Sequence, residues 1–336
     1  MTRSKFLAIG GLVLSLICSS TQHINAQDED LSRKITQFLG DNAVNYIQPA
    51  VSVFSANLNS GLYHTAEVHG FLGFEVGLVV MAAPVQDNKK TFRAVLPDTV
   101  HTYVVDRDYD KFVMTSTALG SKGTKVYYRQ ATPGTPPIYE FPGGIDLKVV
   151  PIVAPQLNVG LPLGTEFMFR YVPEVKISDE VGKLKLLGVG LRHSLSQWLP
   201  GPTLSGSPKA GEFPLDISLG FMYQEFTLKD SGGGDFIKTK VFSAGVQASK
   251  SLFILTLYGG LAYETATTNI SYVYRPTTGF DVRVRPFSVK LDEIKGDNNF
   301  RITGGLKIHL VFLDIFADYS VASQPVASAG VVLTFR

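Results

Sequence analysis

Cysteine, tryptophan and charge are all scarce in this sequence. It has one cysteine and one tryptophan among 336 residues, and 18% of the residues are charged whereas 45% are hydrophobic. The cysteine, Cys18, lies in an N-terminal stretch that we expect to be removed, and the bulky Leu16 and Ile17 before it do not suit a lipid-attachment signal. The mature chain is therefore expected to have no disulfide, no thiolate nucleophile and no cysteine-based zinc site.

An excess of basic charge is also missing. The chain has 31 Lys and Arg residues against 29 Asp and Glu residues, and loss of Arg3 and Lys5 with the N-terminal stretch leaves 29 of each sign. No basic run is longer than Lys89–Lys90. Nucleic-acid binding needs positive charge gathered on one surface, so no nucleic-acid partner is expected.

Residues 1–26 have the layout of a secretory signal peptide. Arg3 and Lys5 are followed by an apolar stretch at 6–17 and by a small residue, Ala26, at the expected cleavage site. The apolar stretch has about 12 residues, against the roughly 20 that cross a bilayer as a helix. We therefore predict an exported protein that is cleaved after Ala26.

The rest of the chain has no long apolar run, but it alternates. In residues 215–224, Leu, Ile, Leu, Phe and Tyr occupy one face of an extended chain, and Asp, Ser, Gly, Met and Gln occupy the other. A period of two predicts a strand with one oily face and one polar or small face. Ten segments share this pattern: residues 72–82, 156–161, 166–171, 187–192, 215–224, 242–248, 253–263, 302–308, 313–321 and 327–335.

Loop lengths favour a membrane barrel over a soluble sandwich, which also alternates. If the strands alternate in direction, tight connections at 162–164, 250–251 and 310–311 fall on one side, and the long connections at 84–150 and 274–297 fall on the other. Short periplasmic turns and long external loops are typical of transmembrane barrels. The long connection at 194–212 is the exception, because it falls on the predicted periplasmic side.

We therefore predict an all-β fold, an antiparallel transmembrane β-barrel of about ten strands over residues 67–336 with a large external excursion at 84–150. Twelve or fourteen strands are the alternative, if the β-branched and aromatic residues around 92–139 add hairpins to the wall. The outer membrane is the expected location, with lipid around the barrel.

The last residues predict how the barrel reaches the membrane. Residues 329–336 alternate to the end of the chain, and an aromatic, Phe335, is the penultimate residue. This pattern resembles the terminal strand that the outer-membrane assembly machinery reads in bacterial barrels. The expected partners are that machinery, outer-membrane lipid and, if the lumen is open, a small solute.

Residues 27–66 precede the predicted barrel and contain two helical patterns. Apolar residues at spacings of three and four predict helices at 31–39 and 42–58, and Pro49 is expected to bend or restart the second. An amphipathic helix must bury its apolar stripe against something. We expect this segment to plug the lumen or to dock at the periplasmic mouth; the alternative is a loosely attached periplasmic helix pair.

Charged residues on the polar faces of the strands are the candidate site residues. Lys307 is predicted to lie roughly opposite Asp314 on the neighbouring strand, close enough for an ion pair. Such charges usually pair inside a narrow, filled barrel, and the alternative is that they line a path for a polar solute. The full set of lumen-lining candidates is Glu75, Glu166, Arg170, Arg192, Asp216, Lys307, Asp314 and Asp318.

No pattern in the sequence predicts an enzyme, a cofactor or a metal site. The mature chain has no H-x-x-x-H pair and no G-x-S-x-G motif. Asp106, Asp108 and Asp110 resemble the start of a calcium loop, but Lys111 stands where that loop needs glycine and Thr117 stands where it needs glutamate. The five mature histidines, none at metal spacing, are His64, His69, His101, His193 and His309.

Three blocks carry a family resemblance. Residues 57–66, 160–170 and 191–200 resemble an uncharacterised family of outer-membrane proteins of the Bacteroidetes type, a domain of unknown function. This resemblance implies a barrel and no particular activity. More loosely, a helical segment before a barrel is similar in architecture to the fatty-acid transporter family, in which the N-terminus plugs the lumen.

The function that the sequence favours is passive. We expect a transporter or channel for a small solute, apolar solutes included, with the N-terminal segment as its gate. The alternative is a structural or adhesive surface barrel, with a sealed lumen and external loops that bind partners.

Overall fold

The computed structural model describes residues 41–96, 110–127, 129, 133–134, 139–178, 182–199, 214–229, 233–274 and 287–335. Its elements are α3 (Asp41–Leu58), β1 (Phe74–Pro84), the 3-10 helix η1 (Asp87–Lys89), β2 (Thr91–Val95), β3 (Phe112–Ser116), β4 (Lys125–Val126), β5 (Tyr139–Glu140), β6 (Val149–Leu161), β7 (Thr165–Ser178), β8 (Gly182–Ser194), the 3-10 helix η2 (Ser196–Trp198), β9 (Asp216–Lys229), β10 (Asp235–Leu252), β11 (Leu255–Tyr274), β12 (Phe287–Lys295), β13 (Phe300–Leu310), β14 (Leu313–Val321) and β15 (Val326–Phe335). Within these residues, no helix is long and apolar enough to cross a membrane. The predicted signal peptide and the predicted helix at 31–39 lie outside them.

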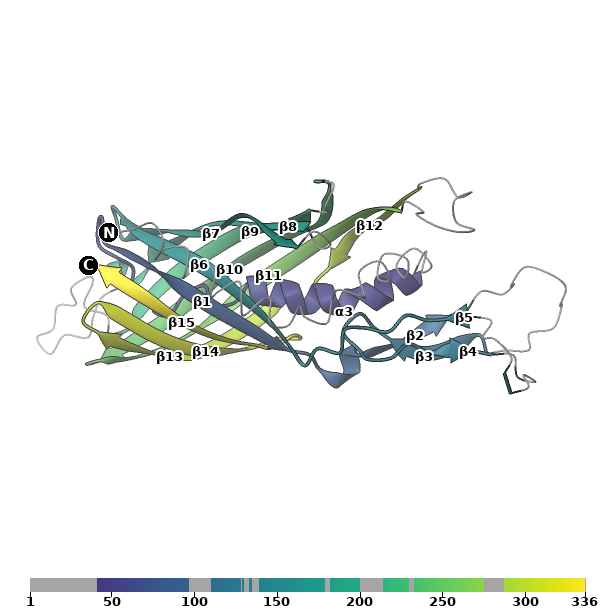
Figure 1. The fold of residues 1–336 in the computed structure, drawn as a ribbon. Helices are drawn as coiled ribbons and strands as arrows, with labels where there is room; N and C mark the ends of the chain where they lie inside the picture. Colours follow the sequence, from purple (N-terminus) through teal and green to yellow (C-terminus); the bar gives the residue numbers. More distant parts are fainter. Residues whose placement is uncertain are drawn as a thin grey trace, which may run out of the picture.

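Ten long antiparallel strands form a closed barrel (Figure 1). Around the wall the order is β1, β6, β7, β8, β9, β10, β11, β13, β14 and β15, and β15 pairs with β1 to close the ring. The first and last strands stay in register from the Phe74–Phe335 pair to the Ala82–Ala327 pair. Each wall strand therefore has a hydrogen-bonded neighbour on both sides, which leaves no open edge. The predicted ten-stranded antiparallel barrel is confirmed.

The alternative of twelve or fourteen wall strands is wrong. The excursion does form hairpins, but β2 pairs with β3 and β4 pairs with β5 in two separate two-stranded sheets. β12 is not a further wall strand either. It pairs with β11 from Thr267 to Tyr274, beyond the stretch of β11 that pairs with β13. β12 therefore extends the sheet at one end of the barrel, and β2 to β5 form hairpins outside the ring.

The two faces of the wall differ as the alternation predicts. Along β15, buried and exposed residues alternate at every position. The inner face buries many small and polar residues, including Gln156, Asn158, Ser218, Gln224, Ser243, Gln247, Thr256, Thr303, Ser320 and Ser328. The outer face exposes large apolar residues, including Val76, Val80, Leu187, Val189, Leu219, Phe221, Val246, Leu257, Leu261, Ile302, Leu306, Ile308, Ile315, Val331 and Leu333. This distribution is the reverse of that in a soluble protein.

The two ends of the barrel also differ. At one end, here called the turn end, tight turns at 162–164, 253–254 and 311–312 join neighbouring strands. At the other end, here called the loop end, lies the excursion between β1 and β6, with its separate hairpins (Figure 1). The predicted division into short connections on one side and a long excursion on the other therefore matches the structure.

Two predicted turns were misplaced. The turn predicted at 310–311 lies at Val311 and Phe312, because Leu310 pairs with Leu313. Polar Lys250 and Ser251 suggested a turn, but both pair with β11, and the turn lies at Phe253 and Ile254. Phe253 has a φ of 59°, the left-handed backbone that a two-residue hairpin turn requires and that sequence alternation does not reveal.

α3 enters the barrel from the loop end (Figure 1). Near its start, Ala43 lies in an apolar cluster with residues of β2 and β4. Further along, Val51 packs with residues of β11 and β12, and Val53 packs with residues of β1 and β6. The helix predicted at 42–58 is thus confirmed. The segment was expected to plug the lumen or to dock at the periplasmic mouth. In the structure α3 lies in the lumen, and it enters from the end opposite the turn end.

Pro49 does not restart the helix. α3 continues through it as one element from Asp41 to Leu58. Proline removes one backbone hydrogen bond of a helix, and buried residues on both sides of it, Tyr46 and Val51, keep the helix packed in its place.

Residues 59–70, here called the luminal segment, lead from α3 along the inside of the wall to the turn end, where β1 begins. The segment leaves the helix at Gly61, which has a φ of 59°, and a Cβ there would lie 2.5 Å from Val79 Cγ1. Glycine suits this point on both counts. Near the turn end, a Cβ at Gly160 of β6 would lie 1.9 Å from the Gly70 carbonyl oxygen. The backbone of the luminal segment therefore packs directly against the backbone of β6, with no side chain between them.

We expect Gly160→Ala to lower the free energy of unfolding by about 1–3 kcal/mol, because its methyl group would overlap the backbone of the luminal segment. The measurement is the urea midpoint of detergent-solubilised protein, followed by the gel mobility that separates folded from unfolded barrels. Gly304→Ala in β13 is the matched control, since nothing lies within 4 Å of a Cβ there. Equal midpoints for the two variants would contradict the placement of the luminal segment against β6.

Candidate functional site

The C-terminal end of α3 is held by Arg170, a buried residue of β7. Its Nη1 donates to the Leu58 carbonyl (3.2 Å), and its Nη2 donates to the carbonyls of Ser60 (3.0 Å) and Gly61. The last carbonyls of a helix lack partners within it and carry partial negative charge. The last turn of α3 has no basic residue of its own. A cation of the barrel wall therefore satisfies the end of the helix.

A second arginine, Arg301 of β13, holds the same region from another side of the wall. It donates to the Ala56 carbonyl (2.9 Å) and to Ser60 Oγ (2.5 Å). Its Nε and Nη2 also donate to the two oxygens of Glu264 on β11, at 3.0 and 3.1 Å. Such a two-bond pairing fixes the direction of the guanidinium group. Glu264 of the wall therefore orients the guanidinium group that binds the N-terminal segment.

A third arginine, Arg192 of β8, binds the part of the luminal segment that lies nearer the turn end. Its Nη1 donates to the Thr65 carbonyl, and its Nη2 donates to the Glu67 carbonyl (3.1 Å). The same Nη2 donates to Glu166 Oε1 (2.7 Å), and Glu166 Oε2 accepts from the backbone N–H of His69 (3.0 Å). Two neighbouring wall strands thus supply one buried ion pair, and backbone groups of the luminal segment add hydrogen bonds to both of its partners.

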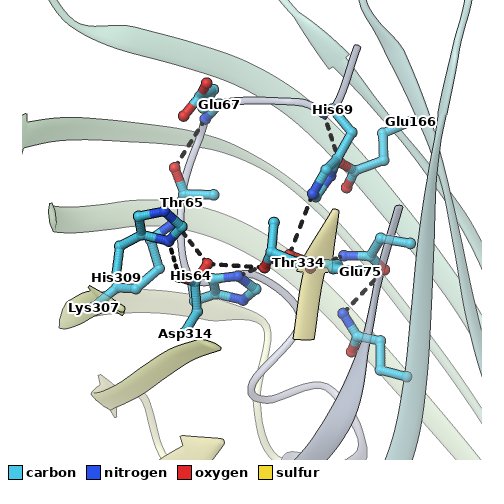
Figure 2. A network of polar contacts seen from close by, with 12 residues as sticks. His64, Thr65, Glu67, His69, Glu75, Glu166, Lys307, His309, Asp314 and Thr334 are labelled. Carbon is cyan, nitrogen blue, oxygen red and sulfur yellow. Dashed lines mark hydrogen bonds and ion pairs between the residues drawn. The ribbon is translucent and has the colours of Figure 1, made fainter. Parts of the chain in front are cut away.

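Near the turn end, the luminal segment and the wall form a polar cluster, shown in Figure 2 and defined as His64, His69, Glu75, Glu166, Lys307, His309, Asp314 and Thr334. Glu75 of β1 lies at its centre. Its Oε2 is 3.0 Å from His64 Nε2 and 3.7 Å from His69 Nε2. Its Oε1 accepts from Asn158 Nδ2 (2.6 Å). The two histidines of the segment therefore meet a carboxylate that the wall already orients.

Asp314 of β14 is the second centre of the cluster. Its Oδ1 is 2.5 Å from His309 Nδ1, and its Oδ2 is 3.3 Å from Lys307 Nζ. Thr334 donates to Oδ2 (3.1 Å). The ion pair predicted between Lys307 and Asp314 is therefore present.

Two cavities flank the luminal segment. One, of about 30 Å³, lies between the luminal segment at 59–63 and the strands β7 to β11, β13 and β14. The other, of about 130 Å³, lies beside the polar cluster and is lined by Thr65, Glu67, Val68, His69, Gly70, Glu75, Lys307, Asp314 and Thr334. Both are small beside the clefts of roughly 300–1,000 Å³ that hold typical small-molecule ligands.

The structure brings most of the predicted site residues together. Buried in the lumen are Glu75, Glu166, Arg170, Arg192, Lys307, Asp314 and Asp318. Asp318 accepts a hydrogen bond from Tyr258 (3.0 Å), which is not one of the residues of the polar cluster. Asp216 is partly buried at the first position of β9, near the turn end.

Sequence reasoning missed several residues that hold the segment. Glu264 and Arg301 each lie one position beyond a predicted strand end, 253–263 and 302–308. Extending the alternation by one residue would have found both, because they keep the inward phase of their strands. His64 and His69 lie on a segment without periodic structure, so no pattern could predict their orientation.

Together, the fold and the lumen define a class of protein: a closed ten-stranded β-barrel filled by its own N-terminal segment. The chain belongs to a family of unknown function, DUF6588, with residues 3–335 matched. The predicted resemblance to an uncharacterised family is thereby confirmed, while the Bacteroidetes origin stays a prediction. No curated protein matches the chain.

Several solved membrane proteins are similar to this chain only in a weak sense. Ail, the attachment invasion locus protein of Yersinia pestis, is 8% identical with a TM-score of 0.24, over 78% of this chain and 97% of that chain. The β domain of the Bordetella autotransporter BrkA is 12% identical with a TM-score of 0.26, over 78% and 100%. The Ralstonia pickettii toluene transporter TbuX is 10% identical with a TM-score of 0.24, over 81% and 91%. At such TM-scores these likenesses carry no argument about function.

We predict that Arg192→Met lowers the free energy of unfolding by about 3–5 kcal/mol, because it leaves Glu166 buried without its partner. The double variant Arg192→Met/Glu166→Gln should recover part of this loss. Lys183→Met is the control, since its ion pair with Glu174 is exposed and should change stability by less than about 1 kcal/mol. Urea midpoints measure all three, and equal losses for Arg192→Met and Lys183→Met would contradict the buried pairing.

Proposed function

We propose that the protein is an outer-membrane barrel with its loop end outside the cell and its lumen sealed by its own N-terminal segment. The observation that carries the membrane location is the outer face of the wall. Val76, Leu219 and Leu257, on three different strands, are 43%, 48% and 44% exposed. A soluble monomer rarely exposes an apolar patch beyond a few hundred Å², whereas lipid covers such a face around a closed barrel.

Aromatic residues support two membrane interfaces. Trp198, Phe253 and Phe312 are exposed at the turn end. Tyr263 and Tyr319 are exposed on β11 and β14 toward the loop end. Bilayer interfaces favour aromatic rings, and membrane barrels carry a girdle at each interface. In such barrels the short turns face the periplasm, which favours placing the loop end outside.

The contacts of the luminal segment support a sealed lumen. Gln156 donates to the Leu62 carbonyl (3.1 Å), and Ser249 of β10 accepts from the Ala66 N–H (2.9 Å). With the three arginines, these bonds come from several sides of the wall. A solute path would have to break many of them at once, and each broken bond leaves a buried polar group without its partner.

A barrel whose lumen is sealed can act through the surface that it exposes to other molecules. At the loop end, the start of α3 packs with the excursion hairpins, and Asn42 exchanges two hydrogen bonds with the backbone of Val95 in β2, at 2.7 and 3.0 Å. This assembly is anchored by a helix that continues into the lumen. We infer a structural or adhesive role, with the excursion as the surface that contacts partners.

Transport with the luminal segment as a gate is the second candidate. The observation that favours it is the nature of the contacts: residues 59–70 form no strand and are held chiefly by side-chain hydrogen bonds to the wall. Such a segment could move as a unit without breaking the barrel. The solute would be small, since the two cavities beside the segment are small.

Two partners follow from the membrane location. Lipid covers the apolar outer face. The assembly machinery would read β15, which alternates to Phe335 and is joined to β1 when the ring closes.

The proposed orientation predicts which engineered thiols are reached from outside. Asn45→Cys, at an exposed position of α3 near the loop end, should react with a membrane-impermeant maleimide in intact cells. Leu163→Cys, at the turn end and 80% exposed, should react only after lysis. The parent protein measures background labelling. The reverse pattern would overturn the orientation.

The sealed lumen predicts no steady current from the full chain in a planar bilayer. Arg170→Met/Arg301→Met, which removes two attachments of the segment, should give frequent current steps, whereas Lys183→Met should stay silent. Regular openings of the unmodified protein would favour the gated transporter over the sealed barrel.

A further inference from the structure

The polar cluster contains a group of side chains with the composition and geometry of a metal site. Among the described residues, His64, Glu75 and Asp314 each offer a ligand atom, and these atoms all lie within 4.8 Å of one another. Ligands of tetrahedral zinc, each about 2.0–2.2 Å from the ion, lie roughly 3.4 Å apart. Small side-chain rotations that move the ligand atoms by about an ångström would bring the three atoms to that spacing.

His64 provides an independent observation. The side chain is only 2% exposed, and its Nε2 forms no hydrogen bond within the described part of the chain. Nε2 nevertheless lies 3.0 Å from Glu75 Oε2, without the alignment of a hydrogen bond. A buried polar atom without a hydrogen bond needs an explanation. A cation held between the nitrogen and the oxygen provides one.

Neighbouring residues orient each of the three ligands. The His64 ring stacks on Phe316, with ring centroids 4.7 Å apart and planes 17° apart. Asn158 binds the outer oxygen of Glu75, and Thr334 binds Asp314. Metal ligands in proteins are typically fixed by such outer partners. The geometry is therefore prepared before any ion arrives.

The local charge favours a cation. Glu166 pairs with Arg192, whereas the two ligand carboxylates, Glu75 and Asp314, face one cationic side chain, Lys307. One imidazole with two carboxylates suits zinc-like ions, whereas calcium and magnesium prefer oxygen ligands alone. The neighbouring cavity of about 130 Å³ leaves room for a water at a fourth position.

We propose that His64, Glu75 and Asp314 bind a divalent transition metal of the zinc class, which clamps the luminal segment to β1 and β14. The sequence predicted no metal site because the three ligands come from distant positions and share no motif. The proposal does not rest on the sealed or gated function, because a clamp between segment and wall is compatible with both.

Zinc binding to the full chain tests the proposal directly. Detergent-solubilised protein is stripped with a chelator and dialysed against ZnCl₂, and bound zinc is measured by elemental mass spectrometry. We expect one zinc per chain and a higher unfolding temperature with zinc than without. His193→Ala should bind like the parent, because His193 contacts Thr165 and Gln197 outside the cluster.

Variants of the ligands separate this site from adventitious binding. Glu75→Gln and His64→Asn should each weaken zinc affinity at least tenfold and remove most of the thermal shift, with folding checked by gel mobility. Equal binding by these variants and by His193→Ala would overturn the proposal. The absence of both bound zinc and a thermal shift in the full chain would overturn it independently of any variant.

Discussion

The lumen depends on one kind of interaction, the donation of buried guanidinium hydrogens to backbone carbonyls of the N-terminal segment. Arg170, Arg192 and Arg301 are each almost fully buried, and each reaches a carbonyl at the end of α3 or below it. A buried cation without partners is costly, and so is a buried helix end without donors. The buried arginines and the backbone carbonyls satisfy one another, so the barrel and the N-terminal segment stabilise each other.

Closure of the wall places this polar interior inside lipid. Since β15 pairs with β1, each of the ten wall strands in the described part of the chain has a paired neighbour on both sides, and the apolar side chains of the wall face outward. The same alternation that turns apolar residues outward turns charged residues inward, where the N-terminal segment meets them. The excursion at the loop end is then joined to the lumen through a single continuous helix, α3.

Much of this architecture is readable from the sequence, because period-two alternation and strand length are local properties. All ten wall strands follow from them, and the helix at 42–58 follows from apolar residues at spacings of three and four. Details set by three-dimensional contacts do not follow. The turn at Phe253 depends on a backbone angle, and the polar Lys250 before it belongs to a strand. The pairing of Glu264 with Arg301 lay just beyond the predicted strand ends. The histidines near Glu75 come from an irregular segment, so their approach to β1 becomes visible only in the folded chain.

The central claim is that the luminal segment stays inside the barrel, and a cross-link tests it most directly. Thr65 Oγ1 of the segment lies 3.2 Å from Ser249 Oγ of β10, so cysteines at these positions are close enough for a disulfide. Oxidised membranes carrying Thr65→Cys/Ser249→Cys are denatured and treated with a thiol-reactive mass tag, with the two single variants as controls. We predict an untagged double variant whose two thiols react only after reduction. A double variant with two free thiols under oxidising conditions would contradict the filled lumen.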